Sequence, residues 1–95
     1  MKHYKGMYII RPDLTEEQTK TVVEEINKIF VDHNGTVLSV DEWGLKDMAY
    51  EIQDFRKGYY VVFTVEADAA AVEEFNRIAN IREDIIRHII IKEDD

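Results

Sequence analysis

Cysteine is absent from this chain of 95 residues, and proline occurs once. The missing cysteine excludes disulfides, thiolate nucleophiles and cysteine-based zinc sites. No apolar run approaches the roughly 20 residues of a membrane-spanning helix, and the apolar residues near the start are too few for a signal sequence. We therefore expect a soluble cytoplasmic protein that folds as a single domain over residues 1–95.

Positive charge is also scarce. Twelve Lys and Arg residues stand against 20 Asp and Glu residues, which gives a net charge of -8. This balance opposes nonspecific binding to nucleic acid, which needs a basic surface. Because the Debye length is about 8 Å at cellular salt, acids on a distant helix hardly affect a basic edge. Net charge therefore weakens an RNA-binding interpretation without excluding it.

No group of residues has the pattern of a catalytic site. His3, His33 and His88 are far apart in sequence, and none has metal-ligand spacing with a carboxylate. Paired glutamates lie on polar helix faces, where solvated charge is the ordinary explanation, and no glycine-rich phosphate loop is present. We predict no enzymatic activity, no metal site and no cofactor, and we interpret His88 as a core histidine.

The apolar pattern alternates strand, helix, strand, strand, helix, strand. Strands are predicted over residues 3–10, 36–43 with a continuation at 49–52, 59–66 and 85–92. Gly44 suggests a bulge in the second strand, residues 54–58 read as a turn, and residues 93–95 form an acidic tail.

Two helices separate these strands. The first begins at Thr15, with Gln18 completing a capping box, and ends at Asn34-Gly35, where glycine can take the left-handed conformation. Asp68 caps the second helix. Its predicted inward stripe is Val72, Phe75, Ile78 and Ala79.

Two strand-helix-strand halves of this length indicate an α+β fold, the ferredoxin-like β-α-β-β-α-β sandwich. Its four-stranded antiparallel sheet carries two helices on one face, and right-handed crossovers place the first and third strands at the centre. The opposite face is expected to be open.

That open face is less polar than an exposed antiparallel face usually is. Strand alternation places Met7, Ile9, Tyr60 and Val62 on it, whereas neither face of residues 85–92 is clearly apolar. A covering partner is one explanation, and ordinary scattered surface apolar residues are the other. The face measures only about 400 Å², and a stable interface needs about 800 Å² per partner. Strand ends and loops must therefore contribute to any interface.

Residues 57–64 partly match the third-strand signature of RNA-recognition motifs, but they lack two of its aromatic positions. A turn followed by a β-rich strand explains the match. The basic residues on strands can contact phosphates, with tyrosines packing on sugars or bases. Equally, they can form rim salt bridges with Glu42, Asp47 and Glu51.

The segment EWGLKDMAYEI at residues 42–52 resembles the G-x-K/R-x-L-A-Y-x-I signature of bacterial-type small-subunit ribosomal protein six. The opening MYIIRPDL at residues 7–14, the run Gly58-Tyr59-Tyr60 and the pair Arg87-His88 extend the similarity over residues 2–92. Met48 stands where the family usually has leucine, an apolar exchange that such a position tolerates.

The resemblance implies a structural constituent of the small ribosomal subunit that binds the central domain of small-subunit ribosomal RNA together with ribosomal protein eighteen. Lys46 and Tyr50, at signature positions, are the first candidates for RNA contact, followed by Lys2, Tyr4 and Arg87. Arg56, Lys57 and Lys92 are added on charge alone. The candidates for contact with protein eighteen are Met7, Ile9, Tyr60, Val62, Ile89 and Ile91.

The alternative is a ferredoxin-like dimeric ligand-binding or enzymatic module, in which two open faces seal against each other. Such a module needs a polar cluster lining a cavity, and the sequence shows none. We therefore expect a chain that is monomeric when free and has no membrane partner.

Overall fold

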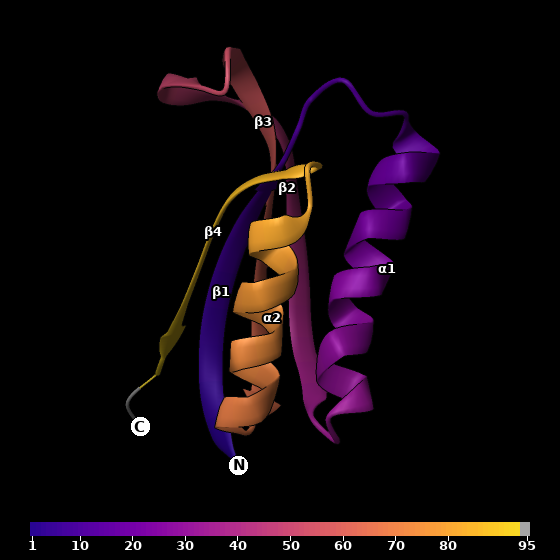
Figure 1. Ribbon diagram of the computed structural model, residues 1–95, viewed down its shortest axis with the longest axis vertical. Helices are drawn as coiled ribbons and strands as arrows, with labels where there is room; N and C mark the ends of the chain where they lie inside the picture. The colour runs from indigo at the N-terminus through magenta and orange to yellow at the C-terminus, as the bar shows by residue number, and fades with distance from the viewer. Residues whose placement is uncertain (94–95) are drawn as a thin grey trace.

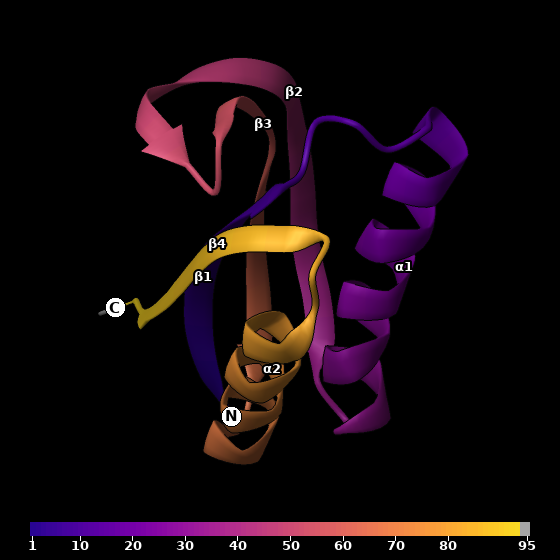
Figure 2. The ribbon, with the colours of Figure 1, turned by 45° about the horizontal axis from the view of Figure 1, so that its top comes forward.

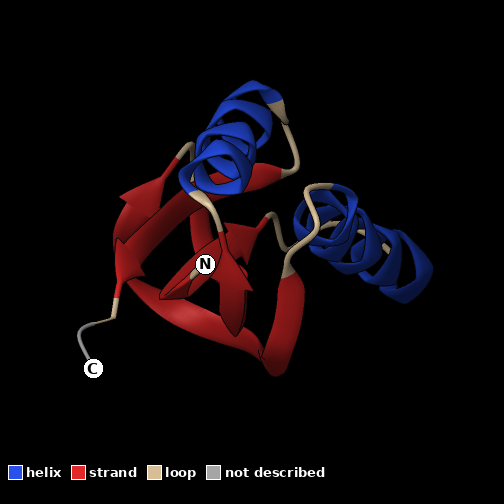
Figure 3. Ribbon diagram, turned by 90° about the horizontal axis from the view of Figure 1, so that it is seen from below, coloured by secondary structure: helices blue, strands red, loops and turns tan. Residues whose placement is uncertain are grey.

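The computed structural model describes residues 1–93, so Asp94 and Asp95 of the predicted acidic tail lie outside the described residues. The chain forms β1 (Lys2–Ile10), α1 (Glu16–Asp32), β2 (Thr36–Ile52), β3 (Phe55–Ala67), α2 (Ala69–Ile81) and β4 (Ile85–Lys92). The strands make one antiparallel sheet in the order β2-β3-β1-β4. Both helices cover the same face (Figures 1 and 3), which confirms the predicted fold.

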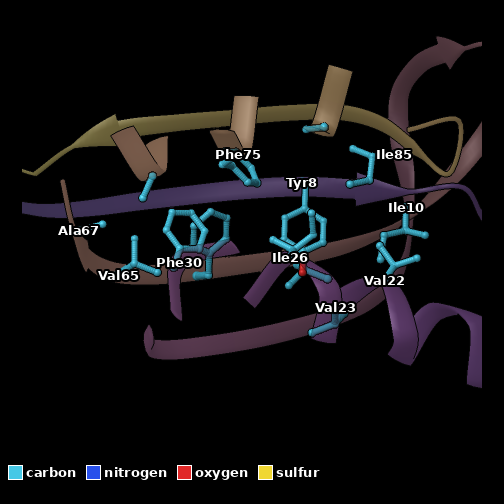
Figure 4. Packing of buried hydrophobic residues seen from close by; sticks show 14 residues of the cluster. Tyr8, Ile10, Val22, Val23, Ile26, Phe30, Val65, Ala67, Phe75 and Ile85 are labelled. Atoms are coloured by element: carbon cyan, nitrogen blue, oxygen red, sulfur yellow. The ribbon is translucent and has the colours of Figure 1, made fainter. Parts of the chain in front are cut away.

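The core lies between the helices and this face of the sheet. Four aromatic rings meet at its centre, those of Tyr8, Phe30, Phe63 and Phe75 (the cluster is drawn in Figure 4), with neighbouring ring centroids 5.3–6.4 Å apart. All four side chains are buried. Burial of this much apolar surface is the main force that holds the helices on the sheet.

The ends of α1 show one correct prediction and one correction. Thr15 caps the helix: its hydroxyl accepts from the Gln18 amide, and the Gln18 side chain accepts from the Thr15 amide. At the other end, Asn34 takes the left-handed conformation (φ 63°), and Gly35 does not. Gly35 is needed for space, because a Cβ there would lie 2.8 Å from the Glu66 carbonyl oxygen.

Helix α2 differs from the prediction in two details. Asp68 stands at the N-cap position, but its side chain forms no capping hydrogen bond. The buried residues are Ala71, Phe75 and Ala79, whereas Val72 and Ile78 are half-buried. Small residues at the first and last of these positions let the helix backbone approach the sheet closely.

The hairpin between β2 and β3 is longer than predicted. β2 runs through Gly44, whose φ of 82° and shifted pairing register form the expected bulge. The chain then turns at Gln53 and Asp54, both at positive φ, as in a type I′ turn. The predicted turn at residues 54–58 is therefore wrong, because the glycine that suggested it, Gly58, lies inside β3.

Among residues 1–93, no helix has the length and apolar character needed to cross a membrane.

Candidate nucleic-acid interface

The outer part of the β2–β3 hairpin, residues 45–58, extends past the end of β1, and we call it the arm. Figure 2 shows the arm curling back toward β4. It lies over the side of the sheet that the helices leave uncovered, because Met48 and Tyr50 share a hollow there with Met7 and Ile9. The sheet face predicted to be open is therefore partly covered by the chain itself.

Two arginines and one glycine fix the arm in this position. The Arg87 guanidinium lies 5.8 Å from the Tyr50 ring centroid, and that of Arg11 lies 5.3 Å from the Phe55 ring centroid. At the base of the arm, Gly58 packs so closely on Ile9 that a Cβ would lie 2.2 Å from Ile9 Cγ2. The position of the arm thus depends on contacts with Ile9, Arg11 and Arg87, which lie outside the β2–β3 hairpin.

Tyr50 and Arg87, two of the predicted RNA contacts, are direct neighbours. The Arg87 Nη1 group donates a hydrogen bond to the Tyr50 hydroxyl at 2.6 Å, although the residues lie 37 positions apart in the chain. The Tyr50 side chain remains 61 % exposed. A cation and an accessible aromatic ring therefore stand side by side, a combination that proteins use to bind single-stranded nucleic acid.

The other predicted cations of the arm have partners within the β2–β3 hairpin. Arg56 pairs with Glu51 at 3.0 Å and Lys57 with Asp47 at 4.0 Å, which are the rim salt bridges considered as an alternative. The Lys46 ammonium lies 5.8 Å from the Trp43 ring centroid. Exposed ion pairs of this kind contribute about 0–1 kcal/mol, so an RNA phosphate can displace them at little cost.

Lys2, Tyr4 and Lys92 lie at the other end of the sheet. Tyr4 is paired with Lys92 across the β1–β4 ladder, whereas Arg87 is paired with Ile9. Five residues of strand separate the two positions, about 17 Å. The Tyr4 ring packs partly against the core. The predicted RNA residues therefore form two groups, one at the arm and one at the chain termini.

One of the candidates for protein contact, Ile9, is buried in the structure. Ile9 is only 3 % exposed, because the base of the arm covers it, so its predicted role in binding protein eighteen is not supported. Met7, Tyr60 and Val62 are half-buried on the same face. The β1–β4 register places Ile89 and Ile91 beside Met7 and Lys5 on this face, where both isoleucines are exposed.

Sequence reasoning missed Trp43 as part of this surface. Its indole stacks on Tyr60 (ring centroids 6.4 Å apart, interplanar angle 11°), and nearly half of the side chain is exposed. The Gly44 bulge turns it to this face. A lone tryptophan one residue before a bulge glycine was the signal in the sequence that could have indicated this.

A larger hollow, about 520 Å³, lies on the helix side of the arm base. Its walls come from the β1–α1 connection, α1, the acidic strand β2 and the neighbouring part of β3, and include Leu14, Leu45, Glu42 and Tyr59. The Tyr59 hydroxyl donates to Glu42 at 2.9 Å. Burial, and next this hydrogen bond, raise the pKa of Tyr59. Among the described residues no group of three His, Asp or Glu side chains could hold a metal ion.

Known proteins resemble this chain over nearly all its length. Residues 3–92 match the family description "Ribosomal protein S6". The 30S ribosomal protein S6 of Thermotoga maritima is 29 % identical and superimposes with a TM-score of 0.92, over 97 % of this chain and 87 % of that one.

A second solved structure shares the fold alone. The C-terminal domain of the MgtC protein from Mycobacterium tuberculosis is 10 % identical, with a TM-score of 0.65 over 98 % of this chain and 88 % of that one. The ferredoxin-like fold thus occurs with very different sequences, so the fold alone does not identify a family. The family match rests on the amino-acid sequence of residues 3–92. The chain belongs to the ribosomal protein S6 family, as a structural, RNA-associated component of the small ribosomal subunit.

Proposed function

We propose that this chain binds the central domain of small-subunit ribosomal RNA as a pair with ribosomal protein eighteen, and that it is monomeric when free. Its place of action is then the cytoplasm, within the small ribosomal subunit. The observation that carries the RNA part is the contact between Tyr50 and Arg87 at the arm. Two elements that are distant in sequence present a cation and an exposed ring at one point.

The RNA surface begins at the arm. Lys46, Arg56, Lys57 and Arg87 supply its positive charge and Tyr50 its exposed ring. The second group, Lys2, Tyr4 and Lys92, extends the contact along β1 and β4. Phosphate contacts of this kind fix the position of the RNA and carry no sequence information by themselves.

The net charge supports the need for a partner. A chain with a charge of -8 repels RNA over most of its surface, so a stable complex needs additional cations from a second protein. A basic partner is in turn attracted to the acidic edge strand β2. That strand carries Asp41, Glu42, Asp47 and Glu51 against one lysine, Lys46.

The partner surface combines this edge with the uncovered face. Val62, Ile89 and Ile91 supply apolar area there, Met7 and Tyr60 lie at its border with the arm, and the 520 Å³ hollow beside Leu45 adds a depression along β2. The sheet face alone offers about 400 Å², half of what a stable interface uses on each side. The β2 edge and its hollow supply the remaining contact area when the partner binds both surfaces.

The alternative function, a dimeric ligand-binding or enzymatic module, is less well supported. In such a dimer two sheet faces must meet over their whole area. Here the arm stands over one part of that face and holds Tyr50 against Arg87. A second copy could seal the face only after the arm moved away.

Replacement of the arm cations tests the RNA surface. Arg87→Ala and Lys46→Ala are each expected to weaken binding to a central-domain RNA fragment. Each should also lower the slope of log affinity against log salt by roughly 0.7–0.9, because one phosphate contact is lost. Filter binding at several salt concentrations measures both quantities.

Arg77→Ala is the matched control, since Arg77 pairs with Glu74 on α2, on the covered side of the sheet. It should leave affinity and slope unchanged. If Arg87→Ala and Lys46→Ala behave like this control, these residues are structural and the proposed RNA surface is wrong.

A further inference from the structure

A small notch opens between the arm and the sheet. Its volume is about 220 Å³. It is lined mainly by apolar side chains from three strands, namely Met7, Ile9, Met48, Ala49, Ile52 and Tyr60, and Tyr50 and Arg87 stand among them. The notch is therefore an apolar slot with one cationic and one phenolic wall.

The notch is held open by backbone geometry as well as by side chains. The Gly44 bulge bends β2, and the missing side chain at Gly58 lets β3 rest directly on Ile9. Any larger residue at position 58 would push the arm away from the sheet. A slot that is shaped before a ligand arrives binds with a smaller loss of conformational entropy.

Arg87 differs from every other arginine of the chain. Arg11, Arg56, Arg77 and Arg82 each form an ion pair with a carboxylate. Within residues 1–93, Arg87 has no carboxylate partner, and its one hydrogen bond goes to the neutral Tyr50 hydroxyl. A guanidinium has five N–H donors, so most of them remain available for an anion. In a chain with 20 acidic residues, the Arg87 guanidinium is thus left able to bind an anion.

We infer that the notch receives one unpaired RNA base, with the adjoining phosphate on Arg87. A nucleotide combines the two properties that the site is built to hold, a flat apolar group and a negative charge one sugar away. The exposed Tyr50 ring stands at the same wall and can pack on the sugar or on the next base. The inference rests on the proposed RNA-binding function and adds to it a pocket for a single base.

Comparison of two single-stranded probes tests this pocket. One is a short oligouridylate, and the other is an abasic ribose-phosphate chain of the same length and charge. At low salt, the wild-type chain should bind the base-bearing probe about tenfold more tightly, as stacking of one base provides. Ala49→Leu, which fills the notch from an exposed position, should bring this ratio close to one and leave binding of the abasic probe unchanged.

Ala70→Leu is the matched control, on the exposed first turn of α2 at the opposite end of the molecule (Figure 1), and it should keep the wild-type ratio. Equal wild-type affinity for both probes, or an unchanged ratio in Ala49→Leu, overturns the inference and leaves the notch to a side chain of the partner protein. In that case binding of central-domain RNA with the partner still supports the proposed function. If that RNA is not bound even with the partner, the proposed function fails and the inference fails with it.

Discussion

Tyr8 is a side chain whose burial works against its chemistry. Its ring lies at the centre of the aromatic core and is fully buried. Its hydroxyl has no hydrogen-bond partner among the described residues. Burial, the largest cause, therefore raises the pKa of this phenol. A buried hydroxyl without a partner costs about 1–3 kcal/mol, because its bonds to water are lost.

Tyr8→Phe tests this reading. The substitution keeps the ring and removes the unpartnered hydroxyl, so the free energy of unfolding should rise by about 1 kcal/mol or stay the same. Urea denaturation followed by circular dichroism measures it. Tyr59→Phe is the comparison, since it removes a hydroxyl that donates to Glu42, and it should not stabilise the chain. A clear loss of stability in Tyr8→Phe would show that the hydroxyl has a partner in solution, such as a buried water.

The two helices begin in different ways. The side chains of Thr15 and Gln18 satisfy two amides at the start of α1. Asp68 satisfies none at the start of α2, and lies instead 4.0 Å from the N-terminal amino group. Equivalent positions in the two halves of the fold therefore contribute different amounts to stability.

Thr15→Ala should lower the free energy of unfolding by about 1 kcal/mol, the usual cost of a lost N-cap. Asp68→Ala should cost less, because only its favourable charge near the helix end and the amino group is lost. Thermal or urea unfolding of both variants provides the comparison. Equal losses would mean that Asp68 caps α2 in solution.

The β2–β3 hairpin marks the limit of prediction at the level of elements. The alternation of apolar residues located both strands, and Gly44 indicated the bulge. The turn was misplaced because Gln53 and Asp54 adopt positive φ without being glycine, whereas Gly58 serves close packing on Ile9. A glycine in a sequence does not reveal whether it serves a backbone conformation with positive φ or the close packing that a missing side chain allows.

For the candidate site, residue types could be predicted and their neighbours could not. Lys46, Tyr50 and Arg87 followed from motif and charge. That Tyr50 meets Arg87 depends on the β1–β4 register, which places Arg87 beside Ile9, and on the curl of the arm. The curl depends in turn on the Gly44 bulge and on the packing of Gly58 against Ile9. The same curl buries Ile9, which simple alternation had placed on an open face.

Charge is unevenly distributed over the whole molecule. β2 forms an acidic edge of the sheet, whereas β4, at the opposite edge, carries Arg87 and Lys92 and no acid. At a Debye length of about 8 Å the two edges act largely independently. The acids of β2 therefore do little to weaken the positive potential at β4.

The most direct test of this account is a titration of a central-domain fragment of small-subunit ribosomal RNA with and without ribosomal protein eighteen. We predict that the chain alone binds the fragment weakly, and that the partner raises its affinity by at least tenfold, because the partner supplies the missing positive charge. Filter binding at one fixed salt concentration is sufficient. Equal affinity in the presence and absence of the partner would contradict the account.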